Sequence, residues 1–468
     1  MEEIQRYKIL LISLIFVVFI FYFYEPDFEY LETVTGILSI VAGEPINASF
    51  PITFYQSAYV DYRFNPPRLR IFTLNKCVKN QFLLADLHFD RDISASVRKN
   101  IYGKPMESHC PSAYIPASPC FYSPYIFSIS LKPNEDPKKV TIFLGNRTVE
   151  LNVQKVYTKS TEGITVCLQP VYYYSQWQNI VLYIEAWRAH GATRFIVYFH
   201  SATKETWKTL EYYRDLGIIE IKPWPSFPSL PVDIADKYPK IDDSVFILSY
   251  FMAMNICILD IKTTIGTVAD FDEVMVPTNG RLLDYATKEM ANTKVGALIF
   301  QNHYVSLTPR IYTSNFSGVR SPKFLTFNRP PKVDYIFNAS TIAVAQVHVP
   351  DSFIDSSMRS EYADGALLHF RYKVESENLK ITEKPFRFFP DNHSPHITNM
   401  EDTAQKIFNG AMLTFSSKPY DTLQKCVRKI IPVEDKVCRS TGGICKEEMD
   451  KVNDWVYDKS DPLFLVGA

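Results

Sequence analysis

From Gly163 onward, short apolar runs alternate with longer amphipathic stretches, and this alternation constrains the fold more than any other feature of the chain. The run at 164–168 predicts a buried strand, and 177–190 predicts a helix because its apolar residues recur about every 3.6 positions. The alternation continues with a strand at 195–199, a helix at 204–216, a strand at 218–221, a helix at 245–259 and a strand at 264–268. This order predicts an α/β domain with a mostly parallel sheet covered by helices.

The preceding segment, residues 31–156, has a different pattern. Short apolar and aromatic runs such as 68–74 and 140–144 are separated by Pro, Asn and Gly, which predicts a β-rich module. Nothing in it has the pattern of a catalytic site, so a packing or spacing role is favoured over a binding role. We therefore expect two folded units, 31–156 and 160–415, followed by a cysteine-containing C-terminal tail at 416–468.

An unbroken apolar and aromatic run at 9–24 predicts one short transmembrane helix, somewhat below the usual length of about 20 residues. Arg6 and Lys8 precede it and acidic residues follow it, which predicts a cytoplasmic tail at 1–8 and a lumenal remainder. A cleaved signal peptide is the alternative, but the bulky residues that end the run disfavour cleavage. The prediction is a single-pass type II protein held by a signal-anchor.

Glycosylation sequons and cysteines test this orientation independently. Eight Cys with no Cys-x-x-Cys pair favour disulfides over zinc. Cys167 and Cys257 lie in apolar segments, where buried free thiols are at least as compatible with the pattern. Pro395 weakens the last of the sequons, which begin at Asn47, Asn146, Asn315, Asn338 and Asn392. These features predict a glycoprotein of the secretory pathway.

The overall composition excludes two classes of protein. A hydrophobic content of 46% and an aromatic content of 14% exclude a disordered chain. Fifty Lys+Arg against 51 Asp+Glu leave a net charge of −1, so no general basic field attracts a nucleic acid backbone.

The strongest chemical signal is Asp270-Phe271-Asp272, which directly follows the predicted strand at 264–268. That position places its carboxylates at the carboxyl edge of the sheet, where open α/β folds bind ligands. Two Asp residues flanking an aromatic suit a divalent ion, which in turn neutralises a diphosphate. An Asp-x-Asp pair is often only a solvated strand end, but its place after a nucleotide-binding half favours the metal–diphosphate site.

Eight blocks of the sequence form an ordered series, at 166–172, 177–187, 190–195, 217–224, 255–257, 270–273, 344–348 and 369–371. Taken in this order, they resemble glycosyltransferase family 92. The resemblance covers about 160 to 415 and implies a GT-A-like nucleotide-binding sandwich in a type II Golgi protein. It also implies an inverting transferase that uses Mn²⁺ and a UDP-sugar, with galactose as the sugar.

The resemblance also implies site residues. Asp270 is expected to contact the nucleotide and Asp272 to bind the metal. His369 is the best candidate for a second metal ligand, with a hydrogen-bonded structural histidine as the alternative. His348 is the second choice, although core packing fits it better. Arg371 is a candidate for pairing a phosphate through its fork of donors, with a surface salt bridge as the alternative.

An inverting transfer needs a carboxylate that takes the proton from the acceptor hydroxyl. Glu361, Asp364 and Asp334 are candidates for this base by their order along the chain. Glu273 is expected to orient Asp272 or to close the loop. Trp224 is expected either to stack on a sugar or to brace its proline-rich loop.

Two functions from different classes follow from these observations. The first is a Mn²⁺-dependent transferase that moves a hexose, galactose from UDP-galactose, onto a glycoprotein glycan. The alternative is a non-catalytic lumenal protein with the same fold that binds glycans or assists another transferase.

Overall fold

The computed structural model describes residues 51–76, 81–89, 96–106, 120–158, 161–291, 294–308, 310–311, 313–327, 332–371, 379–381, 386–411, 413–430, 438 and 440–467. The predicted cytoplasmic tail and membrane span, together with Asn47, Cys77 and Cys110, lie outside these ranges. Within the described ranges, no helix has both the length and the apolar character needed to cross a membrane.

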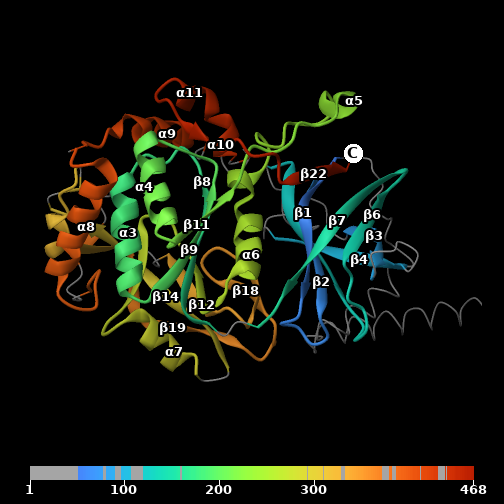
Figure 1. Cartoon of the computed structure of the whole chain (residues 1–468), viewed down its shortest axis with the longest axis horizontal. Coiled ribbons are helices and arrows are strands. Elements are labelled where there is room, and N and C mark those ends of the chain that lie inside the picture. Colours follow the sequence, from blue (N-terminus) through green and yellow to red (C-terminus); the bar gives the residue numbers. More distant parts are fainter. Residues whose placement is uncertain are drawn as a thin grey trace, which may run out of the picture.

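The first unit is a β-sheet that closes on itself (Figure 1). Its strands run in the order β2-β5-β4-β3-β6-β7-β1, and an additional pairing of β1 with β2 closes the ring. Phe54, Ile71 and Leu87 are among the apolar side chains that fill the interior. The strands are β1 (Ile52–Asp61), β2 (Arg68–Lys76), β3 (Gln81–His88), β4 (Ser96–Pro105), β5 (Tyr122–Ser130), β6 (Lys139–Leu144) and β7 (Arg147–Val156).

The second unit contains a mixed sheet in the order β11-β9-β8-β12-β16-β14-β15-β20. Off this path, β13 pairs with β19, and β19 also pairs with β14. The strands are β8 (Thr161–Val171), β9 (Ala192–Phe199), β11 (Ile219–Pro223), β12 (Thr263–Val268), β13 (Glu273–Pro277), β14 (Val295–Ser306), β15 (Lys323–Phe327), β16 (Val333–Asn338), β19 (Arg359–His369) and β20 (Leu379–Ile381).

The predicted mostly parallel sheet is correct only for the first half of this unit. Strands β11, β9, β8 and β12 are parallel to one another. Past the Asp270-Phe271-Asp272 motif, β16 runs antiparallel to both β12 and β14. The strand–helix–strand pattern therefore ends at the motif. Antiparallel strands do not need a covering helix in the connection between them, and the later strands pair in this way.

Helices cover both faces of this sheet, which makes the unit an α/β sandwich (Figure 1). One apolar core joins the sheet to α3, α4 and α8, and a second joins it to α6. This second core continues into β1 and β2, so α6 lies between the sheet and the closed barrel. The helices are α3 (Trp177–Ala189), α4 (Lys204–Asp215), α6 (Tyr250–Asp260), α7 (Leu282–Glu289) and α8 (His393–Phe408).

Two buried arginines of the barrel, each paired with Asp61, also join it to the sandwich. The Nη2 atom of Arg63 lies 2.7 Å from Oδ2 of Asp61, and Nη1 of Arg70 lies 3.1 Å from the same oxygen. The Nη1 atom of Arg63 donates to the Ala339 carbonyl, and Nη2 of Arg70 donates to the Ala343 carbonyl, each at 2.8 Å. Polar contacts as well as apolar ones therefore hold the barrel against the α/β unit.

The predicted helices at 177–190 and 204–216 are confirmed as α3 and α4. The helix predicted at 245–259 begins later, at Tyr250. Ile247, Leu248 and Ser249 have positive φ angles of 37°, 51° and 61°, which a right-handed helix does not contain. The Leu248 carbonyl instead accepts a hydrogen bond from the Trp224 indole at 2.9 Å. Tertiary packing therefore overrides the helical pattern here.

The C-terminal residues return to both units. Helices α9 (Ser417–Ile430), α10 (Thr441–Ile444) and α11 (Lys446–Asp450) lie over the sandwich, and β22 (Phe464–Gly467) pairs with β1 (Figure 1). The short helix predicted near 446–457 ends at Asp450, and Val456–Tyr457 forms β21 against β10 (Ser201–Ala202). Disulfides link Cys120 to Cys438 and Cys426 to Cys445.

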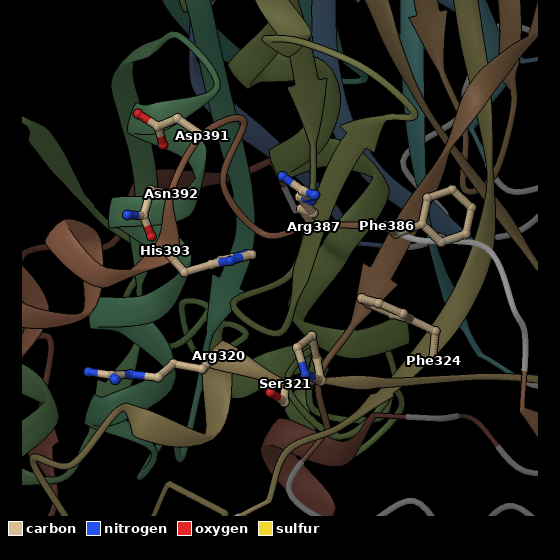
Figure 2. A pocket seen from close by; sticks show the side chains of 9 residues that line it. Arg320, Ser321, Phe324, Phe386, Arg387, Asp391, Asn392 and His393 are labelled. Carbon is tan, nitrogen blue, oxygen red and sulfur yellow. The ribbon is translucent and has the colours of Figure 1, made fainter.

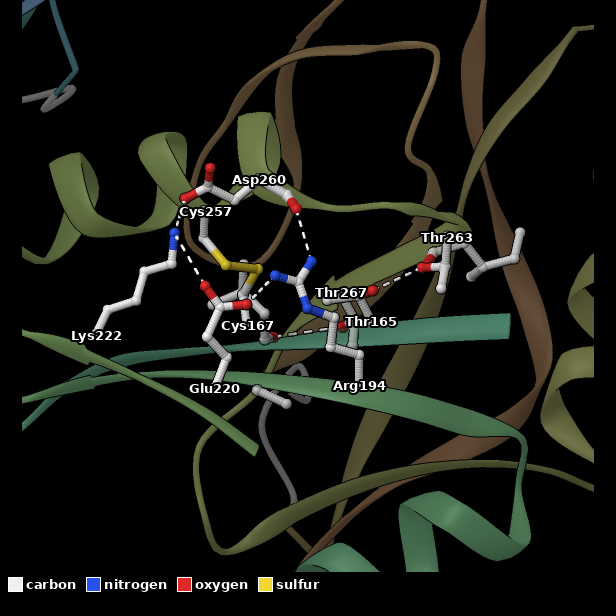
Figure 3. Close-up of a disulfide and its surroundings, with 12 residues drawn as sticks. Thr165, Cys167, Arg194, Glu220, Lys222, Cys257, Asp260, Thr263 and Thr267 are labelled. Carbon is white, nitrogen blue, oxygen red and sulfur yellow. Dashed lines mark hydrogen bonds and ion pairs between the residues drawn. A yellow bond between two sulfur atoms is a disulfide. The ribbon is translucent and has the colours of Figure 1, made fainter. Parts of the chain in front are cut away.

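A third disulfide joins Cys167 of β8 to Cys257 of α6 (Figure 3). The free-thiol interpretation of these two cysteines is therefore wrong, because the sheet and the helix bring their sulfur atoms together. Nearby, Arg194 donates to the Asp260 carbonyl at 2.8 Å, and Lys222 forms an ion pair with the Asp260 carboxylate. Covalent and charged contacts thus hold α6 against three neighbouring strands.

Candidate functional site

The Asp270-Phe271-Asp272 motif lies between the end of β12 and the start of β13. Antiparallel pairing of β13 with β19 places Glu273 directly opposite His369. The backbone N–H of Phe370 also donates to the Asp272 carbonyl at 2.9 Å. Strand pairing, rather than proximity in sequence, therefore brings the histidine to the acidic motif.

Three side chains converge here and form what we call the carboxylate–histidine cluster: Asp272, Glu273 and His369. One ligand atom from each lies within 4.8 Å of the others. The Nε2 atom of His369 lies 3.2 Å from Oδ2 of Asp272, and its Nδ1 lies 3.5 Å from Oε1 of Glu273. Oxygen and imidazole ligands in this number suit a divalent ion such as Mn²⁺.

A positive charge already lies at this cluster. The Arg371 Nε donates to Nε2 of His369 at 2.7 Å and lies 3.7 Å from Oδ2 of Asp272. Because that histidine nitrogen accepts a hydrogen bond, it and the Asp272 oxygen are two electron-pair donors that face one another. Both can bind one metal ion, with Glu273 beside them, so the residues present fit the ion that the sequence predicts.

Burial and mutual repulsion raise the pKa values of the surrounding acids. Burial and the charge of Asp272 raise the pKa of Asp270 to about 7, and burial and Asp270 raise the pKa of Glu273 well above its usual value. Burial and Asp270 also raise the pKa of Asp334 to about 8. Although burial opposes it, His369 and Arg371 hold the pKa of Asp272 below its usual value. A bound divalent cation would offset this crowding of carboxylates.

Helix α3 supports the backbone on both sides of the motif. The Tyr183 hydroxyl donates to the Ala269 carbonyl at 3.0 Å, and the Trp187 indole donates to the Glu273 carbonyl at 3.0 Å. Tyr183 and Trp187 are one helical turn apart on the apolar face of α3, so the helix pattern placed them on one side. Their roles as hydrogen-bond donors depend on the packing of that face against the motif.

Two further contacts were not found by sequence reasoning. The Gln169 side chain, near the end of β8, donates a hydrogen bond to Oδ1 of Asp270. The Tyr304 ring of β14 stacks on His369, with ring centroids 5.2 Å apart and an interplanar angle of 19°. These partners come from separate strands, and no local spacing indicates them.

The structure does not bring Glu361 or Asp364 to the cluster. Asp364 accepts a hydrogen bond from Thr278 at 2.7 Å, at the end of β13 remote from Glu273. Since β19 is extended, the segment between Asp364 and His369 spans about 16 Å. Glu361 lies farther back along β19 and pairs with Arg359 at 2.6 Å.

Asp334, the third candidate base, lies at the start of β16 beside β12. Its charge acts on Glu273, and the charge of Asp270 acts on it. It is therefore the carboxylate, among the three candidates, that the structure places at the motif.

Two other residues considered from sequence have structural partners. Trp224 is fully buried and donates to Leu248, so it braces its loop rather than presenting a face to a sugar. The Nδ1 atom of His348 lies 2.7 Å from the Val333 carbonyl, and His348 is outside the cluster.

The C-terminal residues lie against the carboxyl ends of β8 and β9. The Tyr172 hydroxyl lies 2.6 Å from Oγ1 of Thr441, and the Tyr173 hydroxyl donates to the Gly442 carbonyl at 3.1 Å. The pairing of β21 with β10 extends this contact. We call residues 440–458 the C-terminal clasp, and it covers the edge where open α/β sheets bind ligands.

Comparison with known proteins identifies the family. The model for glycosyltransferase family 92 matches residues 162–408, which include the motif, the cluster and α8. This chain belongs to glycosyltransferase family 92. The family 92 match ends before the clasp, so the clasp is an addition to the matched region. No curated protein matches the chain by sequence.

Solved structures that match this family 92 member are distant from it in sequence. The S. aureus TarS structure with UDP-GlcNAc is 12% identical, with a TM-score of 0.26, and the match covers 46% of this chain and 60% of TarS. The Mycobacterium tuberculosis glucosyl-3-phosphoglycerate synthase structure with Mn²⁺, UDP-glucose and phosphoglyceric acid is 11% identical, with a TM-score of 0.25. That match covers 54% of this chain and 86% of the synthase.

Proposed function

We propose that this family 92 member is a metal-dependent, inverting glycosyltransferase that moves a hexose, galactose from UDP-galactose, onto a glycoprotein glycan. The observation that carries the proposal is the carboxylate–histidine cluster, whose ligand atoms lie within 4.8 Å of one another beside β12. Such a cluster at the carboxyl side of a parallel strand suits a cation bound to a diphosphate.

In this proposal Asp272 and His369 hold the ion, and Glu273 lies beside them. The bound ion would neutralise the diphosphate of the donor. Asp270, held by Gln169, faces the nucleotide. Arg371 is within reach of the same carboxylate oxygen and can pair a phosphate with its planar fork of donors.

The base in this proposal is Asp334. An inverting transfer needs a carboxylate that removes the proton from the attacking hydroxyl. Asp334 is half-buried and interacts electrostatically with the motif, whereas Glu361 and Asp364 lie elsewhere on β19. Its carboxylate becomes available as a base when the ion compensates the neighbouring charges.

We also propose that the catalytic unit faces the Golgi lumen behind the membrane anchor at 9–24. The disulfides among the described residues support an oxidising compartment. Asn146 and Asn315, at the predicted sequons, are exposed and accessible for glycosylation.

The test is release of UDP from a panel of UDP-sugars, with Mn²⁺ or a chelator and with or without glycan acceptors. We expect acceptor-dependent turnover of UDP-galactose that needs the metal. Asp272→Ala should abolish turnover, and the variant should still unfold cooperatively, which shows that it is folded. Nucleotide binding without turnover of any donor would instead support the non-catalytic glycan-binding alternative.

A further inference from the structure

A separate hollow of about 650 Å³ lies between the start of α8 and the segment that leads into β15 (Figure 2). Its lining includes two guanidinium groups, one imidazole and two phenyl rings, from Arg320, Arg387, His393, Phe324 and Phe386. None of these residues belongs to the carboxylate–histidine cluster. The hollow is therefore a distinct feature of the sandwich.

Two arginines against one carboxylate give the lining of this hollow a net positive charge. Both are exposed, and within the described part of the chain neither has an ion-pair or hydrogen-bond partner. The lining carboxylate, Asp391, is engaged by His396, with Nε2 and Oδ1 2.7 Å apart. An anion entering the hollow would therefore meet two available guanidinium forks.

The imidazole adds a polar group without a partner. The Nε2 atom of His393 is buried and has no hydrogen-bond partner among the described residues. Burial and the nearby charge of Arg387 lower the pKa of His393, so the ring is neutral near pH 7. A neutral ring nitrogen can donate to or accept from a hydroxyl group.

The phenyl rings form an apolar floor. The Phe386 ring lies 5.9 Å from that of Phe324 and 4.8 Å from that of His303. His303 precedes Tyr304, the residue that stacks on His369. The hollow thus lies near the end of β14 that also reaches the cluster.

We propose that this hollow is an acceptor subsite that binds a saccharide residue carrying a carboxylate or a sulfate. Guanidinium forks bind such planar or tetrahedral anions with paired hydrogen bonds. The imidazole meets a sugar hydroxyl, and the phenyl floor accepts the apolar face of the ring. The role as an acceptor subsite rests on the proposed transferase function, but binding of the saccharide does not.

The test measures binding of three matched disaccharides to the full chain by calorimetry at constant ionic strength. One ends in glucuronic acid, one in a sulfated galactose and one in unmodified galactose. We expect at least one anionic probe to bind about tenfold or more tightly than the neutral one, the size of a charge-assisted hydrogen bond. Comparing the two anionic probes identifies which anion the hollow prefers.

Substitutions then assign the binding to this hollow. Arg320→Gln and Arg387→Gln should each weaken the preferred anionic probe about tenfold and leave the neutral probe unchanged. Lys323→Gln is the matched control, because it removes a positive charge from β15 without lining the hollow. Unfolding temperatures should be equal in all variants.

Equal binding of neutral and anionic probes, or binding unaffected by both arginine substitutions, would overturn the proposal. So would displacement of the sulfated disaccharide by inorganic sulfate at the same concentration, since that would mean adventitious anion binding only. The transferase proposal fails separately, through absence of UDP release with both neutral and anionic acceptors. Anion binding without turnover would therefore still support the hollow as a binding site for an anionic saccharide.

Discussion

The Nε2 atom of His369 lies 3.2 Å from Oδ2 of Asp272, although the two residues are 97 positions apart in the sequence. The contact depends on the pairing of β13 with β19, which places Glu273 opposite His369. Two hydrogen-bond acceptors this close need a compensating positive charge, and Arg371 provides one in this structure.

His369→Ala should raise the Mn²⁺ concentration needed for half-maximal UDP release by about 10–100-fold, because it removes one of the converging ligands. Titration of UDP release with Mn²⁺ measures the effect. His348→Ala is the control, since that histidine lies outside the cluster. An unchanged Mn²⁺ requirement in His369→Ala would rule out the histidine as a ligand.

Asp334→Asn should lower kcat by about 10²–10⁴-fold, as loss of a general base does. The Mn²⁺ requirement should stay the same, which separates this effect from loss of the metal. Asp364→Asn is the matched control, because that carboxylate bonds to Thr278 at the far end of β13. If Asp364→Asn lost activity and Asp334→Asn kept it, the assignment of the base would be wrong.

Removal of the Cys167–Cys257 disulfide should destabilise the protein more than removal of Cys426–Cys445. The first closes a segment of 90 residues and the second one of 19. Loop-closure entropy predicts losses of about 4–5 and about 3 kcal/mol, respectively. Urea unfolding of the two double-alanine variants compares them. The reverse order would show that packing around the sulfurs outweighs the chain-entropy effect.

Asp242→Asn should stabilise the protein at neutral pH. Burial, with repulsion from Asp243, raises the pKa of Asp242 to about 6, although its carboxylate accepts from Phe227 N–H at 3.2 Å. The folded pKa exceeds the unfolded value of about 3.9, so the folded state binds more protons and loses stability as pH rises from about 4 to about 6.

The asparagine cannot ionise, so the variant should gain about 1–2 kcal/mol at pH 7 and nothing near pH 4. Urea unfolding across this pH range measures the difference. Asp236→Asn, at an exposed position in the same loop, is the control. A stability difference that did not change with pH would contradict this explanation.

Tyr172→Phe and Thr441→Val should each weaken UDP binding. Their 2.6 Å hydroxyl contact holds the clasp against β8, at the sheet edge where open α/β folds bind ligands. The double variant should lose less than the sum of the single losses, since both remove the same contact. Calorimetric UDP binding with Mn²⁺ measures the cycle. Additive losses would show that the two residues act independently.

Local patterns were sufficient for the first half of the α/β unit. The apolar spacing of α3 and α4 is repeated within each helix, so their positions could be predicted closely. Asp270 and Asp272 were found because a strand that ends at two carboxylates is itself a local signal. His369 and Arg371 came from the resemblance to family 92.

Other features depend on contacts between distant segments. The order of residues placed Glu361 and Asp364 before His369, but only the register of β13 on β19 shows that Asp364 lies at the other end. The start of α6 was misplaced because Trp224 and Leu248 meet in the folded chain.

Local sequence patterns specify the repeating strands and helices, the acidic motif at a strand end and the change of pattern near residue 160. Contacts between distant segments specify that β16 runs antiparallel, that Cys167 pairs with Cys257, and that the C-terminal clasp covers β8. The physical reason is that periodicity reports the environment of each residue in its own element. Strand register, disulfide pairing and site assembly depend instead on which distant surfaces pack together.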